Sequence, residues 1–148
     1  MKQYVVIGLG RFGSSVARTL AHNNREVLAI DSCQDYVDDI MDEVTHCVQV
    51  DATDIDALKS LGLRNYDVAV VAIGDLEASI MTTMLLKELG VKYVIARATS
   101  DLHGKVLERI GANRVIFPER DMGTRLSHTL MFSNIMDYID IAPGYSIM

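Results

Sequence analysis

The sequence predicts an α/β fold, a Rossmann-like, doubly wound domain built on a six-stranded parallel sheet. Six short apolar runs rich in β-branched residues have the length of strands. They lie at residues 4–7, 27–30, 47–50, 68–73, 93–96 and 115–117. Segments with helical spacing separate them, and the runs are continuously apolar rather than alternating, which is typical of a sheet covered on both faces.

The segments between the runs are predicted to be helices that cross over between parallel strands. Their apolar residues are three or four positions apart, as in Val16 and Leu20, in Ile55, Leu58 and Leu61, and in Ile80, Met84 and Leu85. Three segments end at a glycine, Gly62, Gly90 or Gly111, which can close a helix in the left-handed conformation. The strict alternation of strands and helices implies right-handed crossover connections in a parallel sheet.

The pattern changes after the sixth run, which Pro118 ends. Residues 119–131 are predicted to form a helix with Met122, Leu126 and Leu130 on one stripe. A second short amphipathic run, 134–141, ends at Pro143, and residues 145–148 start a further element. We therefore expect one Rossmann-type domain at 1–118, with a crossover helix and the start of a linker at 119–148. The two stripes predict contact with a second subunit; alternatively, they cover an open sheet edge.

Charge and composition exclude several classes of partner. The net charge of −6 and a pI near 5.1 provide no basic surface for nucleic acid. The longest apolar stretch, 68–73, is far shorter than the roughly 20 residues that span a bilayer, so no direct membrane insertion is expected. Two cysteines, Cys33 and Cys47, match neither a zinc knuckle nor a redox pair. We expect a cytoplasmic protein.

A glycine-rich turn follows the first strand and opens the first helix, with the sequence Gly8-Leu9-Gly10-Arg11-Phe12-Gly13. Gly8 permits the tight turn, Gly10 lets the backbone approach a phosphate, and Gly13 lets the helix pack close to the strand. The N-terminus of the helix offers unpaired amides to an anion. In this context the motif predicts a bound nucleotide.

Acidic residues follow the second and third strands. Asp31, with Ser32 beside it, ends the second strand about 20 residues after the glycines, where a carboxylate accepts hydrogen bonds from the ribose. Its negative charge would repel the 2′-phosphate group of NADP, so NADP is disfavoured as a ligand. Asp51, followed by Ala52 and Thr53, ends the third strand and lines the adenine side of the pocket. An equally plausible reading makes Thr53 or Asp51 the N-cap of the next helix.

Two arginines favour a ligand with more negative charge than NAD. Arg11 lies within the glycine turn and can reach past the first two phosphates, and Arg97 follows the fifth strand at the same edge. Residues 73–77 lie over the crevice where the strand order reverses, and they include Ile73, Gly74 and Glu77. An ATP-like ligand fits this arrangement best.

Groups for catalysis are scarce at this edge of the sheet. No tyrosine has a lysine four positions on, and no Gly-Lys-Ser or Gly-Lys-Thr follows the glycines. Of the histidines, His103 alone follows a strand on the nucleotide edge. We therefore expect a protein that is not an enzyme, with a small NAD-linked oxidoreductase or redox-sensing module as the alternative and a fold kept only for oligomerisation as a third reading.

Longer motifs are more specific than the glycines. They are VVIGLGRFG at 5–13, LGLRN at 61–65, VAIG at 71–74, LLKELG at 85–90, KVLERIGA at 105–112 and PERDMG at 118–123. In these stretches, which span nearly the whole chain, the sequence resembles the N-terminal nucleotide-binding domain of the RCK (KTN) proteins of the KtrA and TrkA type. Those proteins are cytosolic gating subunits of potassium channels and transporters.

The resemblance implies a regulatory subunit that binds ATP, ADP or NAD(H). Carried over by position, Arg11 and Arg97 contact the outer phosphates and Asp31 the ribose. Residues 51–53 contact the adenosine. Arg97 stands where the nearest relatives often have lysine, which keeps the charge but changes the contact.

The resemblance also implies an assembly. Dimers form an octameric ring under a membrane-embedded potassium transporter, at the inner face of the cell membrane, and the nucleotide sets the shape of the ring. Glu119 then approaches the terminal phosphate from the neighbouring subunit, which requires a bridging Mg²⁺ or Ca²⁺ ion, or Arg11, between the two negative charges. The family's C-terminal domain would begin near Met148, so we expect that domain to be absent from this chain.

Overall fold

The six strands form one parallel sheet. A computed structural model describes the backbone of residues 2–140 and the side chains of residues 2–132. The strands are β1 (Gln3–Ile7), β2 (Glu26–Asp31), β3 (His46–Gln49), β4 (Val68–Val71), β5 (Val94–Arg97) and β6 (Arg114–Ile116). Every neighbouring pair is parallel, in the order β3-β2-β1-β4-β5-β6. This confirms the predicted Rossmann-like, doubly wound fold.

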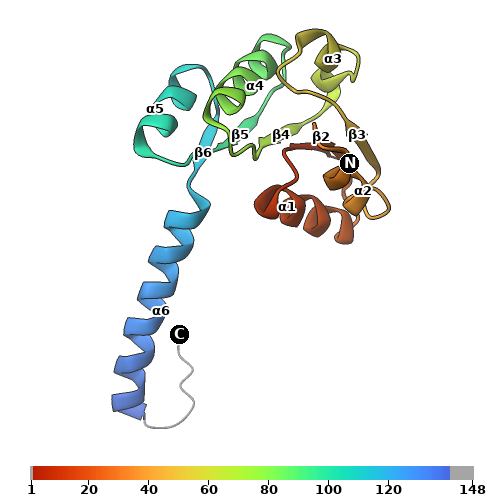
Figure 1. Cartoon of the computed structure of the whole chain (residues 1–148). Coiled ribbons are helices and arrows are strands. Elements are labelled where there is room, and N and C mark those ends of the chain that lie inside the picture. The colour runs from red at the N-terminus through yellow and green to blue at the C-terminus, as the bar shows by residue number, and fades with distance from the viewer. Residues whose placement is uncertain (1, 141–148) are drawn as a thin grey trace. The chain divides into compact units, whose positions relative to one another are not determined.

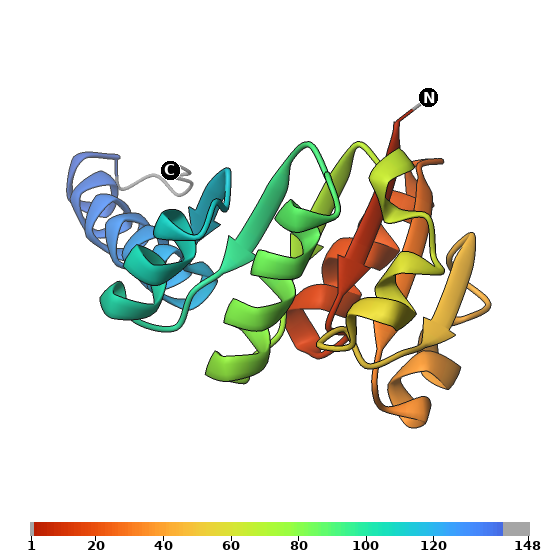
Figure 2. The same ribbon diagram turned by 90° about the horizontal axis from the view of Figure 1, so that it is seen from above.

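Helices connect the strands and cover both faces of the sheet. They are α1 (Arg11–His22), α2 (Gln34–Ile40), α3 (Ile55–Lys59), a 3₁₀ turn η1 (Leu63–Asn65), α4 (Leu76–Glu88) and α5 (Asp101–Arg109). Figures 1 and 2 show α1 and α2 on one face and α3, α4 and α5 on the other. The three glycines expected to close helices, Gly62, Gly90 and Gly111, all have φ in the left-handed region.

The central strands carry the core because both of their faces are covered. Val5, Val6 and Ile7 of β1 are buried, as are residues 27–30 of β2. Burial of each valine, leucine or isoleucine side chain among them contributes about 1.5–3 kcal/mol. Continuous burial along these strands is the pattern that the unbroken apolar runs predicted.

Helix α4 turns a polar stripe toward the interior. Ser79, Thr82 and Thr83 are fully buried. The hydroxyl groups of Ser79 and Thr82 have partners, whereas the Thr83 Oγ1 atom has none among the residues that the structure describes. An unsatisfied buried hydroxyl group is a cost to the folded state.

Removing this hydroxyl group should therefore stabilise the protein. We expect Thr83→Val, which keeps the side-chain shape, to raise the free energy of unfolding by about 1 kcal/mol. Differential scanning calorimetry should show a melting temperature a few degrees higher. A lower melting temperature would mean that Thr83 has a partner that matters.

The chain divides into two compact units, Met1–Ile116 and Phe117–Met148. The second unit is built on α6 (Pro118–Asp140), a single continuous helix with Pro118 at its first position, where a missing N–H costs nothing. The predicted break between two runs, 119–131 and 134–141, is wrong as far as Asp140, because no glycine or proline separates the two runs. Residues 141–148, including Pro143, lie outside the described residues.

The stripe that the sequence predicted on α6 faces solvent. Met122, Leu126 and Leu130 are 61%, 56% and 56% exposed. Among the described residues, no helix has both the length and the apolar character needed to cross a bilayer.

Candidate functional site

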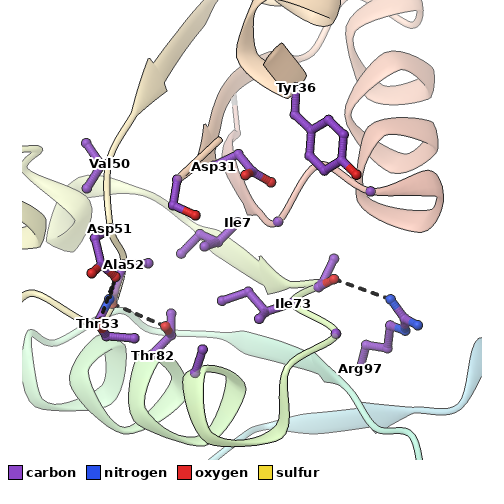
Figure 3. A pocket seen from close by; sticks show the side chains of 16 residues that line it. Ile7, Asp31, Tyr36, Val50, Asp51, Ala52, Thr53, Ile73, Thr82 and Arg97 are labelled. Carbon is purple, nitrogen blue, oxygen red and sulfur yellow. Dashed lines mark hydrogen bonds between the residues drawn. The ribbon is translucent and has the colours of Figure 1, made fainter. Parts of the chain in front are cut away.

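A crevice of about 320 Å³ opens at the carboxyl ends of the strands, where β1 and β4 lie side by side and the crossovers diverge. This is the point at which open α/β sheets bind their ligands. Figure 3 shows the side chains that line it. The lining includes ten of the predicted site residues: Gly8, Gly10, Asp31, Ser32, Asp51, Ala52, Thr53, Ile73, Gly74 and Arg97.

The glycine turn has the geometry expected of Gly8 and Gly13. Gly8 has φ +99°, and a Cβ atom there would lie 2.9 Å from the backbone of Ala72 and Ile73. A Cβ atom on Gly13 would lie only 1.7 Å from the Gly8 carbonyl oxygen. At Gly10 a Cβ atom would meet nothing within 4 Å, so the chain itself leaves the space beside Gly10 open. That is the space in which a phosphate would approach the backbone.

Asp31 ties the end of β2 to the glycine turn. Its Oδ2 atom accepts a hydrogen bond from the Leu9 N–H at 2.6 Å, and Oδ1 accepts one from the Cys33 N–H at 2.8 Å. A carboxylate has about four acceptor positions, so further hydrogen bonds from a ribose remain possible. Asp31 therefore shapes the turn as well as lining the crevice.

The loop after β3 forms the opposite wall. The Asp51 Oδ1 atom accepts hydrogen bonds from the Thr53 N–H at 2.9 Å and from the Thr53 Oγ1 at 2.7 Å. These two bonds hold the pKa of the Asp51 carboxyl group below its ordinary value. The N-cap of α3 is Asp54, whose side chain accepts from Asp56 N and Ala57 N, so the alternative reading of Thr53 or Asp51 as the cap is wrong. Asp51 forms an Asx turn instead.

Arg97 lies at the end of β5 and borders the same crevice. Its Nη1 atom donates to the Ala72 carbonyl oxygen at 3.4 Å, across the end of β4 (Figure 3). Arg97 therefore brings a positive charge to a cavity in which Asp31 and Asp51 are negative. A guanidinium group in this position can bind a phosphate oxygen.

Five predicted residues lie outside the crevice lining. Phe12 packs against the core beneath α1, and Gly13 is buried under the turn. Glu77 is exposed in the first turn of α4. Glu119 is exposed in the first turn of α6, in the second unit, and its contact with a neighbouring subunit's phosphate stays a prediction. Within the described range, no group of three metal-binding side chains occurs.

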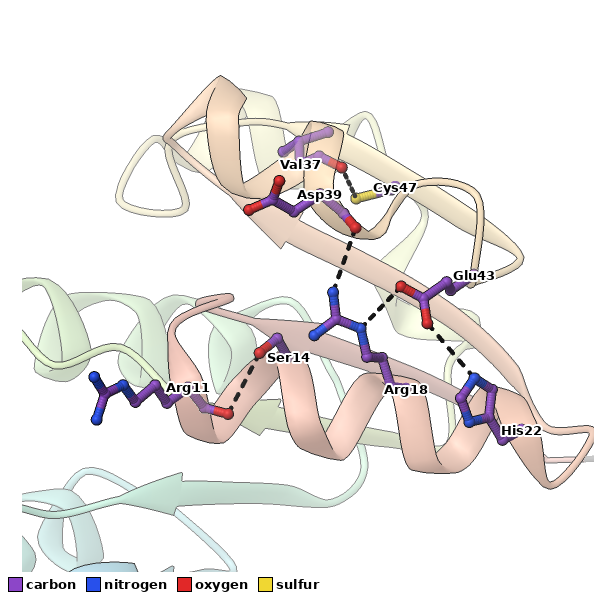
Figure 4. A network of polar contacts seen from close by, with 8 residues as sticks. All are labelled: Arg11, Ser14, Arg18, His22, Val37, Asp39, Glu43 and Cys47. Atoms are coloured by element: carbon purple, nitrogen blue, oxygen red, sulfur yellow. Dashed lines mark hydrogen bonds and ion pairs between the residues drawn. The ribbon is translucent and has the colours of Figure 1, made fainter.

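Arg11, the fifth, borders a smaller hollow of about 200 Å³ next to the crevice. The two hollows share Gly10 and Tyr36. In Figure 4, Arg18 pairs with Glu43 at 2.9 Å, and the guanidinium group of Arg11 extends away from that pair. Arg11 thus stands beside the glycine turn, and its contact with an outer phosphate stays a prediction.

The sequence reasoning missed six residues of the lining: Ile7, Tyr36, Val50, Ala72, Ala78 and Thr82. Ala78 and Thr82 are four residues apart on one face of α4 and follow its N-cap, Asp75. That spacing, placed directly after the loop at the switch point, is the signal that points to them. Tyr36 carries no comparable signal, because α2 is short and its other residues are mixed in character.

His103 is buried and uses both ring nitrogens within the protein. Nδ1 accepts a hydrogen bond from the Thr99 N–H at 3.0 Å, so Nε2 carries the proton and donates to the Ser79 Oγ, also at 3.0 Å. Burial, and then the positive charge of Arg97, lower the pKa of His103. His103 does not line the crevice.

Comparisons with known proteins identify the family of the chain. The TrkA-N domain family matches residues 4–118. The Ktr system potassium uptake proteins C and A of Bacillus subtilis are 44% and 45% identical over 148 residues, which cover 99% of this chain and 67% of each relative.

Two solved structures share the fold. The NAD(P)-binding domain of an exopolyphosphatase-related protein from Archaeoglobus fulgidus aligns with a TM-score of 0.79 at 25% identity, over 88% of this chain and 98% of that one. GsuK bound to ADP aligns with a TM-score of 0.75 at 17% identity, over 92% of this chain and 35% of that one. The chain belongs to the TrkA-N domain family.

Proposed function

We propose that this chain is the nucleotide-binding module of a regulatory subunit for potassium uptake, and that ADP or ATP, or else NAD(H), binds in the crevice at the switch point. One observation carries the proposal. The open backbone at Gly10 and the carboxylate of Asp31 lie in a single cavity, where a helix N-terminus meets the ribose-binding position. The similarity to the two Ktr system proteins supports the role in potassium uptake.

The module acts by binding alone. A nucleotide that binds one conformation of the assembly more tightly than another shifts the equilibrium between them, and this shift moves the gate of a membrane-embedded partner. The hydrogen bonds of His103 support a role without catalysis, because both ring nitrogens are already used. The working location is the cytoplasmic face of the cell membrane.

The assembly is a homo-oligomer, with dimers forming an octameric ring. More than half of the surface of Met122, Leu126 and Leu130 is exposed along α6, and this supports a second subunit as the cover for that helix. Glu119, in the first turn of the same helix, would reach the terminal phosphate of the neighbouring subunit through a Mg²⁺ or Ca²⁺ ion.

Calorimetric titration with ATP, ADP, NADH and AMP tests the proposal. We expect ATP or ADP to bind. Binding of NADH alone would favour the alternative, an NAD-linked oxidoreductase or redox-sensing module. Binding of none of the four would leave the fold with a role in oligomerisation only.

Replacing Arg11 with alanine tests its contact with the outer phosphates. We expect the affinity for ATP to fall about 10-fold, since a charge-assisted hydrogen bond is lost, and the affinity for AMP to stay within about 2-fold. The same titration measures both. Equal losses for ATP and AMP would contradict the role assigned to Arg11.

A further inference from the structure

The peptide unit that joins Ala52 and Thr53 is fixed at both ends. Its carbonyl oxygen, on Ala52, accepts a hydrogen bond from the Thr82 Oγ1 atom at 3.2 Å. Its N–H, on Thr53, donates to Asp51 Oδ1 at 2.9 Å. Figure 3 shows both contacts at the wall of the crevice. The Thr82 side chain is fully buried, so its hydroxyl group has no competing contact with bulk water.

These hydrogen bonds leave one donor and one acceptor of the loop without a partner inside the protein. Within the described part of the chain, the Ala52 N–H donates to no partner and the Asp51 Oδ2 atom accepts from none. Both residues line the crevice. The loop therefore offers an N–H donor beside a carboxylate acceptor.

This pair is complementary to adenine and not to guanine. Adenine presents an acceptor at N1 and a donor at its 6-amino group, whereas guanine presents a donor at N1 and an acceptor at O6. Guanine would place its O6 against the carboxylate and its N1–H against the Ala52 N–H. An unmatched buried polar pair of this kind is costly.

We propose that Thr82 is a positioning residue that makes the crevice selective for adenine over guanine. This inference rests on the proposed nucleotide-binding function. The hydroxyl group of Thr82 holds the Ala52 carbonyl group toward α4. Without that bond only the hydrogen bond from the Thr53 N–H holds the peptide unit, and the Ala52 carbonyl oxygen can turn into the crevice. There it would accept a hydrogen bond from the N1–H of guanine.

Titration of ADP and GDP into the wild type and into Thr82→Val tests the inference. We expect the wild type to bind ADP more tightly than GDP. In Thr82→Val, ADP affinity should fall about 10-fold while GDP affinity is unchanged or rises, so the ADP-to-GDP ratio falls at least 10-fold. Thr82→Ser, which keeps the hydroxyl group, should stay within about 2-fold of the wild-type ratio.

Thr83→Val is the matched control, because it removes a buried hydroxyl group from the next residue of α4 and should leave the ratio unchanged. If Thr82→Val does not fold, Thr82→Ala loses the same hydroxyl group without placing a methyl group near the Ala52 carbonyl. An ADP-to-GDP ratio that is the same with and without the hydroxyl group, including equal losses for both nucleotides, would overturn the role of Thr82. A wild type that binds neither nucleotide would remove the binding of adenine nucleotides on which the inference rests.

Discussion

Replacing Gly13 with alanine is expected to destabilise the protein by at least about 4 kcal/mol, a large part of the 5–15 kcal/mol that usually separates folded from unfolded domains. The added Cβ atom would lie 1.7 Å from the Gly8 carbonyl oxygen, and a backbone oxygen in a tight turn cannot move away as a flexible side chain can. Helix α1 would have to separate from β1. Circular dichroism during thermal or urea unfolding measures the loss.

Gly10→Ala is the control for that prediction. It adds the same methyl group three residues earlier, at a position with extended backbone and open space, so the melting temperature should stay close to that of the wild type. A Gly13→Ala variant as stable as Gly10→Ala would mean that the packing of α1 on the turn is not as close as described.

Gly13 is expected to matter most for stability, whereas Gly10 is expected to matter most for nucleotide binding. We expect Gly10→Ala to fold normally and to lose about 100-fold in affinity for ADP, because its methyl group occupies the space through which a phosphate reaches the backbone amides. Isothermal titration calorimetry on the folded variant measures this. An unchanged affinity of Gly10→Ala for ADP would mean that the phosphates do not bind beside Gly10.

Gly74→Ala is the matched control for Gly10→Ala. Gly74 also lines the crevice, and a Cβ atom there would also meet nothing within 4 Å, yet Gly74 lies after β4 and is not part of the glycine turn. Its effect on ADP affinity should be much smaller. An equal loss at both positions would show crowding of the cavity rather than a blocked contact with the turn.

The fold was predictable because central strands of a parallel sheet, buried on both faces, appear in the sequence as continuous apolar runs. The residues at which the strands end were not predictable in the same way. Ala72 and Ile73 continue the apolar run of β4, yet they leave the strand and line the crevice, since the Gly8 turn packs against their backbone. The continuous α6 was not predicted because its apolar stripe has a gap near residue 133, although nothing there stops a helix.

The lining of the crevice was predictable where residues follow strands and not where helices approach it. Asp31, Asp51 and Arg97 come to one edge because parallel strands end there, which the sequence order alone implies. Thr82 reaches the crevice only through the packing of α4, and nothing local marks its hydroxyl group as the partner of a carbonyl group 30 residues away. The alternative reading named Thr53 or Asp51 rather than Asp54 as the N-cap of α3, because all three residues can cap a helix and all lie in one loop.

A crystal structure of the chain grown with ADP shows whether the nucleotide binds at the glycine turn. We expect electron density for the diphosphate over the backbone of Gly10, with the ribose hydroxyl groups within hydrogen-bond distance of the Asp31 carboxylate and the base beside Ala52. Density for ADP at any other place on the chain, with water alone between Gly10 and Asp31, would contradict this expectation.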